Sequence, residues 1–340
     1  MHATVTVPKR SFLNGRSRLV RHRFRQLTGW VLGAVVTASG AFAVSHDASA
    51  DDSPGVSVLQ ASSQGAAGEQ DKQDKTLLRH QLSTGDSLRY QVTHVAKTKT
   101  RINGSEEIVN VHTTSVRVWK VLAVTDKEMT FEHSVESVQM TQQTGDKDEI
   151  RWDSTSGEKP PRAFSVVATQ IGSPLATVTM NGRGEELKRE DHGGTKASLG
   201  MGQLTLALPA QPIATGESWS VPSDVRVRTD AGLVKRIKIR QLYTLKKVKA
   251  GVATISVRSE PLTPIETESV QAQVVQQLSN GSIRFDVDNG VLLSKELDWD
   301  ETVVGFQGPG SMLEYRARMT EERLADEPVQ TAGKLTAPLR

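Results

Sequence analysis

The sequence predicts an all-β protein with minor helix, in which antiparallel sheets are built from two tandem related β repeats in a half-barrel or sandwich-like arrangement. Three observations predict this fold. Apolar and polar residues alternate with a period of two, turns containing glycine separate the alternating segments, and two short motifs recur at a similar offset. Together they favour a sheet protein whose second half repeats the first.

Alternating segments occur in both halves of the chain. They cover residues 88–92, 129–135, 237–245 and 313–319. Alternation places one set of side chains on a buried face of a sheet and the other set in water, as half-exposed antiparallel strands require. Helical patterning is sparse, and only residues 163–171 and 267–278 are expected to hold short helices.

Turn chemistry separates the alternating segments. Asparagine or aspartate close to glycine supplies the positive φ angles that tight hairpin turns need. The expected turns are Asn103-Gly104, Asn181-Gly182, Asp230-Ala231-Gly232, Asn280-Gly281 and Asn289-Gly290. Such short connections favour antiparallel pairing of consecutive strands.

Two motifs recur in the same order along the chain. Residues 84–87 (Thr-Gly-Asp-Ser) return as residues 215–218 (Thr-Gly-Glu-Ser), an offset of 215 − 84 = 131 residues. Residues 150–153 (Ile-Arg-Trp-Asp) return as residues 283–286 (Ile-Arg-Phe-Asp), an offset of 283 − 150 = 133 residues. We therefore expect one β repeat over residues 76–205 and a second over residues 206–320. Chance recurrence of short turn motifs is the alternative.

The first 50 residues have the three parts of a secretory signal peptide. A cationic stretch runs to Arg25, an apolar stretch follows from Leu27 to Val44, and small residues lead to Ala50. Cleavage after Ala50 or Ala43 predicts an exported protein, periplasmic or extracellular, with no stable membrane span after cleavage. A membrane tether through an uncleaved signal is the alternative. Residues 51–75 are expected to form a flexible linker, and residues 321–340 a flexible tail.

Charge and cysteine content exclude several classes of function. The chain has 42 Lys and Arg against 39 Asp and Glu, but residues 1–50 hold seven of these cations and one of the acids. Without them the balance is 35 − 38 = −3, so the basic charge belongs to the leader and predicts no nucleic-acid partner. The absence of cysteine from the sequence excludes disulfides, thiolate metal sites and cysteine nucleophiles.

The turn motifs carry a resemblance to a known family. Residues 206–209 (Leu-Ala-Leu-Pro) lead into residues 216–219 (Gly-Glu-Ser-Trp), after a long hairpin and an Arg-aromatic-Asp strand. This order resembles an uncharacterised family of exported, β-rich bacterial proteins of the planctomycete type, over residues 80–320. The resemblance implies no catalytic residues. More distantly, an exported β body is similar in fold to half-barrels that ferry lipids or lipoproteins, which does not fix its function.

One cationic cluster is the sequence's candidate surface for an anionic partner. Its members alternate with apolar residues on either side of the turn at Asp230 and are Arg226, Arg228, Arg236, Lys238 and Arg240. On one hairpin these like charges repel one another. An envelope protein, an acidic glycan or a lipid would relieve that repulsion. The alternative is internal pairing with an acidic stripe on a neighbouring strand, formed by Glu296, Asp298 and Asp300.

No other pattern predicts a catalytic, cofactor or metal site. Residues 286–290 hold oxygen ligands but lack the spacing of a calcium loop, and a hairpin turn explains them. Ser156 and Lys159 are followed by two prolines, which prevent the helical turn that their chemistry would need. The five histidines of the mature chain form no metal-binding motif, and His133 is expected to be a hydrogen-bonded core residue.

These observations predict a non-enzymatic binding or scaffold protein of the periplasm or cell envelope, without a cofactor. The alternative is a carrier that holds an apolar or amphipathic ligand in a concave β-sheet. The expected lining of that sheet consists of Leu88, Tyr90, Ile237, Ile239, Tyr243 and Tyr315.

Overall fold

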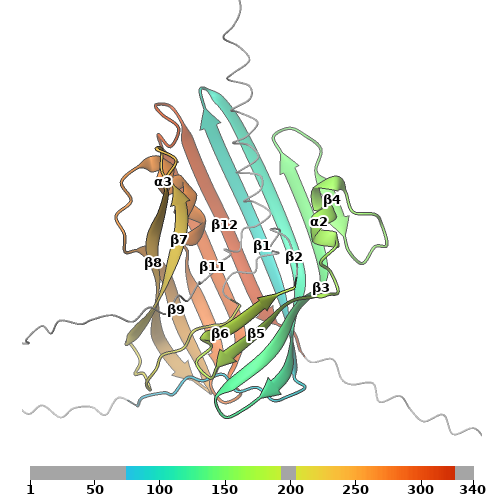
Figure 1. Cartoon of the computed structure of the whole chain (residues 1–340), viewed down its shortest axis with the longest axis vertical. Helices are drawn as coiled ribbons and strands as arrows, with labels where there is room; N and C mark the ends of the chain where they lie inside the picture. The colour runs from blue at the N-terminus through green and yellow to red at the C-terminus, as the bar shows by residue number, and fades with distance from the viewer. Residues whose placement is uncertain (1–73, 193–203, 326–340) are drawn as a thin grey trace, which may run out of the picture.

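The computed structural model describes residues 74–192 and 204–325, and their strands form one antiparallel sheet (Figure 1). The strands are β1 (Ser87–Ile102), β2 (Ser105–Val124), β3 (Glu128–Thr144), β4 (Ile150–Asp153), β5 (Pro174–Asn181), β6 (Glu186–Asp191), β7 (Ser218–Arg228), β8 (Val234–Lys249), β9 (Val252–Pro261), β10 (Asn280–Asp286), β11 (Val291–Val304) and β12 (Met312–Arg323). Their order is β6-β5-β3-β2-β1-β12-β11-β10-β9-β8-β7, and β4 also pairs with β3. The predicted all-β, antiparallel fold is confirmed.

The sheet is strongly curved and open, because its end strands β6 and β7 are not paired with each other. Figure 1 shows the sheet curving from β7, β8 and β9 on one side, through β11, β12, β1 and β2, to β3 and β4 on the other side, with β5 and β6 crossing in front at the lower end of the view. Register shifts interrupt the pairing within β2, β3, β8 and β10. Such bulges bend strands and increase their twist, which favours the half-barrel shape.

Two short helices lie on one face of the sheet, which we call the inner face. A 3₁₀ turn (Arg162–Phe164) leads into α2 (Ser165–Ala168), and Phe164 packs against Val135 and Val138 of β3. The second helix, α3 (Glu268–Val274), is followed by the 3₁₀ turn Val275–Gln277 and packs on β7 and β8. Both helices lie where the sequence predicts them.

The two halves of the chain have a similar order of elements: β1 to β4, the helix α2, and β5 and β6 in the first half, and β7 to β9, the helix α3, and β10 to β12 in the second. The turn before each half is also built alike. The amide of Gly85 donates to the carbonyl of Val121, and the amide of Gly216 donates to that of Leu245. In addition, the Asp86 carboxylate accepts from the amide of Ser83 at 2.7 Å, as the carboxylate of Glu217 does from that of Ala214 at 2.9 Å. The first recurring motif therefore marks equivalent positions of two halves in one sheet.

The second recurring motif does not mark equivalent positions. Residues 150–153 form β4, which precedes α2, whereas residues 283–286 lie in β10, which follows α3. By element order, the counterpart of β10 is β5. The similar offset of 133 residues therefore joins two strand ends that have different places in their halves.

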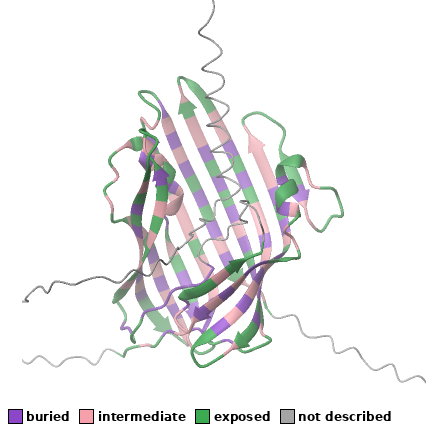
Figure 2. Ribbon diagram, viewed as in Figure 1, coloured by how far each residue is buried: buried purple, intermediate pink, exposed green. Residues whose placement is uncertain are grey.

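Two segments cross the inner face at one end of the hollow and form a strap, which we define as residues 76–82 and 204–214. They are joined by the paired residues Thr76 and Ile213. Leu78 and Leu206 belong to the main hydrophobic core, together with inner-face residues such as Phe131 and Phe285. Figure 2 shows the alternation of buried and more exposed residues along the strands of the sheet. The strap therefore closes this end of the half-barrel with apolar contacts.

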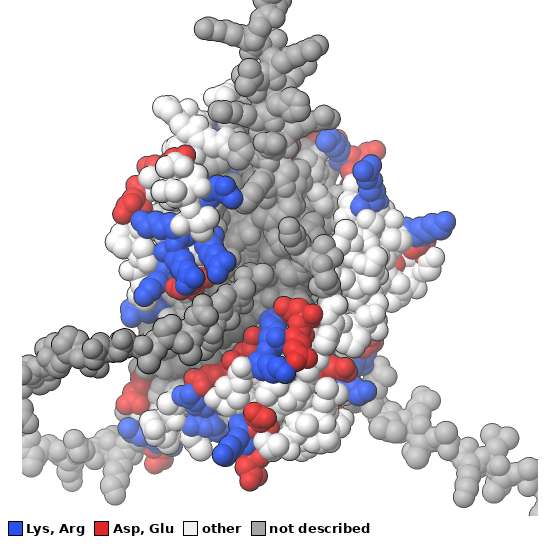
Figure 3. Space-filling model, viewed as in Figure 1, with Lys and Arg blue, Asp and Glu red and all other residues white. Residues whose placement is uncertain are grey.

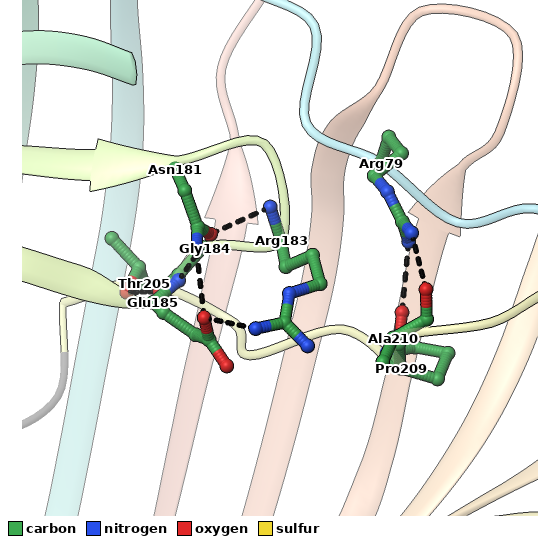
Figure 4. A network of polar contacts seen from close by, with 8 residues as sticks. All are labelled: Arg79, Asn181, Arg183, Gly184, Glu185, Thr205, Pro209 and Ala210. Carbon is green, nitrogen blue, oxygen red and sulfur yellow. Dashed lines mark hydrogen bonds and ion pairs between the residues drawn. The ribbon is translucent and has the colours of Figure 1, made fainter. Parts of the chain in front are cut away.

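Polar contacts hold the strap to the turn after β5 (Figure 4). The Arg79 guanidinium donates to the carbonyls of Pro209 at 2.8 Å and Ala210 at 2.6 Å, which links the two segments of the strap. The Thr205 hydroxyl donates to the carbonyl of Gly184 at 2.5 Å. The His80 ring also joins the two segments of the strap, with Nε2 2.9 Å from the carbonyl oxygen of Leu206. These bonds satisfy backbone carbonyls that the sheet ladders leave unpaired.

Four of the five expected turns connect strands, and one expectation is wrong. Asn103 and Gly104 form the two-residue loop between β1 and β2, with φ of 51° and 79°. Asn280 and Gly281 instead begin β10. A Cβ atom at Gly281 would lie 1.9 Å from the carbonyl oxygen of Glu296, so this glycine allows close approach of two strands rather than a turn.

Some boundaries predicted from the sequence lie outside the described residues. The predicted signal peptide (1–50) and nearly all of the predicted linker (51–75) lie outside the described residues. Residues 326–340 of the predicted tail also lie outside them. β12 extends to Arg323, three residues into the predicted tail segment. Among the helices of the described residues, none is long and apolar enough to cross a membrane.

Candidate functional site

The structure assembles the cationic cluster as the outer face of one hairpin at the edge of the sheet. We define this basic hairpin by Arg226, Arg228, Arg236, Lys238 and Arg240. β7 and β8 pair along their lengths, with Arg226 directly opposite Arg236. The alternate residues Val227 and Ile237 are buried against α3 on the inner face, which leaves the cations on the opposite face.

Carboxylates neutralise only part of the basic hairpin. Arg240 Nη2 lies 2.7 Å from Glu260 Oε2 on β9, and Arg236 Nη1 lies 3.9 Å from Asp224 Oδ2. Within residues 74–192 and 204–325, no ion pair joins Arg226, Arg228 or Lys238 to a carboxylate. Most of the cluster is therefore charged surface without an acidic partner in the described fold.

The acidic stripe predicted to neutralise this hairpin lies elsewhere. Glu296, Asp298 and Asp300 are on β11, which pairs with β10 and β12 and is separated from β8 by two strands. Arg318 of β12 contacts Asp298 at 2.7 Å and Glu296 at 3.6 Å, and Arg316 contacts Asp300 at 3.0 Å. The expectation of internal pairing is wrong for this stripe, because strand order gives it a different cationic partner.

The other sequence candidates are parts of loops. Asp286 Oδ1 accepts hydrogen bonds from the amides of Asp288 and Asn289, which makes residues 286–290 the hairpin turn between β10 and β11. Ser156 lies in the loop after β4, where its hydroxyl donates to the carbonyl of Asp153 at 2.8 Å. These contacts explain both groups as turn-forming residues.

A second candidate site lies on the inner face of β1, in residues that the sequence did not single out. Every second residue of β1 faces inward, and we call His94, Ala96 and Thr98 the inner row. Its two polar members are buried, with 9% of His94 and 3% of Thr98 exposed. Within the described residues, His94 Nε2 and Thr98 Oγ1 have no hydrogen-bond partner. Buried polar atoms without a partner are costly and rare in folded proteins.

Apolar residues flank Ala96 and Thr98 of the inner row on both neighbouring strands. Thr98 is opposite Val109 of β2 and Tyr315 of β12, and Ala96 is opposite Val111 and Ala317. Val109 and Val111 belong to neither of the clusters that α2 and α3 make with the sheet. Of the lining expected for a carrier, Ile237 and Ile239 lie under α3, Tyr315 borders the inner row, and Leu88, Tyr90 and Tyr243 belong to the main core.

Buried and partly buried charged residues lie beside the inner row, toward the strap. Lys295 Nζ of β11 lies 2.5 Å from Glu321 Oε2 of β12, and only 6% of the Glu321 side chain is exposed. Arg117 of β2 is on the same inner face, opposite Tyr90. Burial lowers the pKa of Arg117, and the nearby Glu321 carboxylate partly offsets this effect. The inner face therefore combines an apolar surface with fixed charges.

Two buried histidines are held in the neutral form. Burial, with smaller contributions from Arg117 and His112, lowers the pKa of His94 to about 4. Burial, with smaller contributions from Arg117 and Arg189, lowers the pKa of His133 to about 3. His133 is a core residue as predicted, but the prediction that it is hydrogen-bonded is wrong, because neither ring nitrogen has a partner in the described residues.

We expect acid to destabilise the fold through these two rings. An unfolded histidine has a pKa near 6.5, so below that pH the unfolded chain takes up protons that the buried rings do not. The free energy of unfolding begins to fall as the pH drops through about 6.5. The contribution of His94 to this loss is complete near pH 4, and that of His133 near pH 3. For His94 it amounts to roughly 3 kcal/mol.

Urea unfolding between about pH 7.5 and about pH 4 measures this effect. The His94→Phe variant should lose less free energy of unfolding on acidification than the unsubstituted protein. Thr98→Val, which alters a residue of the inner row that does not titrate, is the matched control and should leave the acid dependence unchanged. Equal acid sensitivity of His94→Phe and the unsubstituted protein would contradict the assignment.

The inner-face polar residues belong to no recognisable motif, so motif spacing does not predict them; they are exceptions to an apolar pattern. His94 and Thr98 occupy the apolar register of β1, as Arg117 does in β2 and Glu321 in β12. Polar residues in the apolar register of several strands are a detectable signal. Only the strand order shows that these residues lie together on the inner face of the sheet.

Comparison with known proteins gives a family match for part of the chain. Residues 192–292 match the model of DUF6263, a family of unknown function. The matched segment includes β7 to β10 and the basic hairpin. No curated protein matches the chain. The match supports an uncharacterised family, while export and a planctomycete-type origin stay predictions.

Several solved structures are similar to this chain over about 70% of its length. A structure of lipid–protein interactions in lipovitellin has a TM-score of 0.40 and 9% sequence identity and covers 72% of this chain. This chain spans 26% of that lipovitellin chain. The COG4313 outer membrane channel from Pseudomonas putida F1 has a TM-score of 0.23 and 8% identity, with coverage of 72% of this chain and 97% of that chain. The translocator domain of autotransporter NalP from Neisseria meningitidis has a TM-score of 0.22 and 6% identity, with coverage of 71% of this chain and 89% of that chain.

Proposed function

We propose that the protein is an exported, non-enzymatic binding protein of the periplasm or cell envelope, and that it carries an apolar or amphipathic ligand on the inner face of its curved sheet. The observation that carries the proposal is the inner row. Two buried polar atoms, His94 Nε2 and Thr98 Oγ1, have no partner in the described residues, and apolar residues of β2 and β12 flank Thr98.

An amphipathic ligand matches the chemistry of this surface. A hydrocarbon chain would contact Val109, Val111 and Tyr315, which lie on the strands on either side of β1. A polar group on the same ligand would give His94 and Thr98 the hydrogen bonds that they lack.

The proposal of export is based on the predicted signal peptide, residues 1–50, rather than on the described residues. The cationic, apolar and small-residue parts of that segment occur in the order of a cleavable signal. A carrier function suits an exported protein with a concave face, since apolar molecules need protection from water when they cross an aqueous compartment. We propose binding without turnover; turnover by the pure protein that a single polar substitution abolishes would contradict that part.

Ligand binding can be tested with a fluorescent fatty acid and the full chain. We expect saturable binding, which His94→Leu weakens about ten-fold because a hydrogen bond to a buried polar group of the ligand is lost. Thr98→Val should have a smaller effect in the same direction. Displacement of the probe by unlabelled oleate measures the affinity of each variant.

The matched control is Thr93→Val on the same strand. Thr93 faces the opposite side of β1 from the inner row, where its hydroxyl lies 3.4 Å from that of Thr114. This variant should bind the probe as the unsubstituted protein does. Absence of saturable binding, or equal weakening by Thr93→Val and His94→Leu, would contradict a site on the inner face.

A further inference from the structure

The basic hairpin carries more charge than its own strands neutralise. On the outer face of β7 and β8 its five cations accompany one carboxylate, that of Asp224, which leaves an excess of 5 − 1 = 4 positive charges. Glu260 on β9 contacts Arg240, but it also contacts Arg258 at 2.6 Å. Figure 3 shows the Lys and Arg side chains gathered over this side of the molecule. Such a surface attracts an anionic partner.

Exposed aliphatic side chains adjoin these cations. Leu233 and Val234 occupy the tip of the hairpin, with 68% and 65% of each residue exposed. Leu262 is also exposed and lies beside the hairpin, since its amide donates to the carbonyl of Lys238 at 2.7 Å. Charged edge strands discourage pairing between sheets, which would account for the cations but not for the aliphatic tip.

The tip has a defined backbone that holds these side chains outward. The amide of Thr229 donates to the carbonyl of Leu233 at 2.8 Å, and that of Gly232 donates to the carbonyl of Thr229 at 2.8 Å. Gly232 has a φ of 79°, which this turn requires and which glycine adopts without strain. The aliphatic pair is therefore presented by an ordered hairpin.

We infer that this hairpin docks the protein on an anionic lipid membrane, with Leu233 and Val234 inserted among the headgroups and the cations of the basic hairpin above them. Cations beside exposed aliphatic residues match the interface of an anionic bilayer, where lipid phosphates lie next to hydrocarbon. Each basic residue close to such a surface strengthens binding about five-fold. An acidic protein would satisfy the charges but would leave the aliphatic tip exposed unless it also offered an apolar pocket.

The chain contains no cysteine, so a single introduced cysteine reports on one position. We would label Leu233→Cys with nitrobenzoxadiazole in the full chain and add vesicles of phosphatidylcholine with phosphatidylglycerol. The dye should shift to shorter wavelength and gain intensity with these vesicles, and not with phosphatidylcholine alone. Leu187→Cys on β6, which is 56% exposed and distant in the sheet order, is the matched control and should show no change.

Charge reversal separates the hairpin from the rest of the chain. On the Leu233→Cys background, Arg226→Glu with Arg236→Glu should weaken the response to anionic vesicles at least ten-fold. Lys120→Glu with Lys127→Glu makes the same change of net charge at exposed positions near the β2–β3 turn and should leave the response intact. No response at position 233, an equal response at position 187, or equal loss in both charge variants would overturn the inference.

Circular dichroism and the urea midpoint of each variant establish that it is folded. Both charge variants alter exposed residues, so their midpoints should stay close to that of the unsubstituted protein. A lipid that binds only the inner face would change probe displacement at His94 and leave the dye at position 233 unaffected. The docking inference and the proposed carrier function can therefore fail independently.

Discussion

Gly290→Ala should destabilise the protein by about 3 kcal/mol or more, as measured by urea unfolding. Gly290 has a φ of 64°, and a Cβ atom there would lie 2.3 Å from the amide nitrogen of Gln81 and 2.7 Å from the carbonyl oxygen of Arg79. The Gln81 amide also donates to the Gly290 carbonyl at 3.1 Å. An added methyl group therefore combines backbone strain with displacement of the strap from the β10–β11 turn.

Gly104→Ala separates these two causes. Gly104 has a φ of 79° in the β1–β2 turn, but nothing lies within 4 Å of the position of its Cβ atom. Its substitution should cost only the left-handed strain of about 1 to 2 kcal/mol. Equal losses in the two variants would show that contact with the strap contributes nothing at Gly290.

Glu321→Ala should cost about 3 to 5 kcal/mol of unfolding free energy, because it removes one partner of a buried ion pair. Lys295 would keep a largely buried ammonium group, 19% exposed, whose contact at 2.5 Å is lost. Arg117 would also lose a nearby negative charge. Replacing both partners, with Lys295→Met and Glu321→Leu, should recover much of this loss, since no uncompensated charge then stays in the pair.

Asp300→Ala is the matched control for the ion pair. Asp300 contacts Arg316 at 3.0 Å, but this pair lies on the outer face and both side chains are largely exposed to water. An exposed pair contributes about 1 kcal/mol or less, so the variant should be nearly as stable as the unsubstituted protein. A loss as large as that of Glu321→Ala would contradict the role given to burial.

The strands and their faces could be predicted from the sequence because alternation reports directly on which side of a sheet is buried. The inward position of Tyr90, Phe131 and Tyr315 follows from the alternation of apolar and polar residues alone. The turn at Asn280 was predicted wrongly because glycine has two uses in a sheet. It permits positive φ in a turn, and it permits close approach of strands, as Gly281 does beside Glu296.

The partners of the charged stripes could not be predicted, because they depend on strand order. The alternation of Asp298 and Asp300 is visible in the sequence, but it does not say which strand lies beside β11. β12 brings Arg316 and Arg318 to these carboxylates and leaves the basic hairpin three positions away, at the far edge. The inner row was missed for a related reason: His94 and Thr98 are ordinary strand residues until β2 and β12 flank them.

The pairing of β1 with β12 has a consequence for folding of the chain during its synthesis. Tyr90 is opposite Arg323, so the seam between the two halves joins the first and last strands of residues 74–325 that the structure describes. Each half can form its hairpins early, but the seam cannot form until β12 has been synthesised. A chain arrested before Met312 would hold two half-sheets with bare edges, prone to pair with other chains. Completion of the seam by β12 therefore covers the two edges at which an incomplete chain would pair with others.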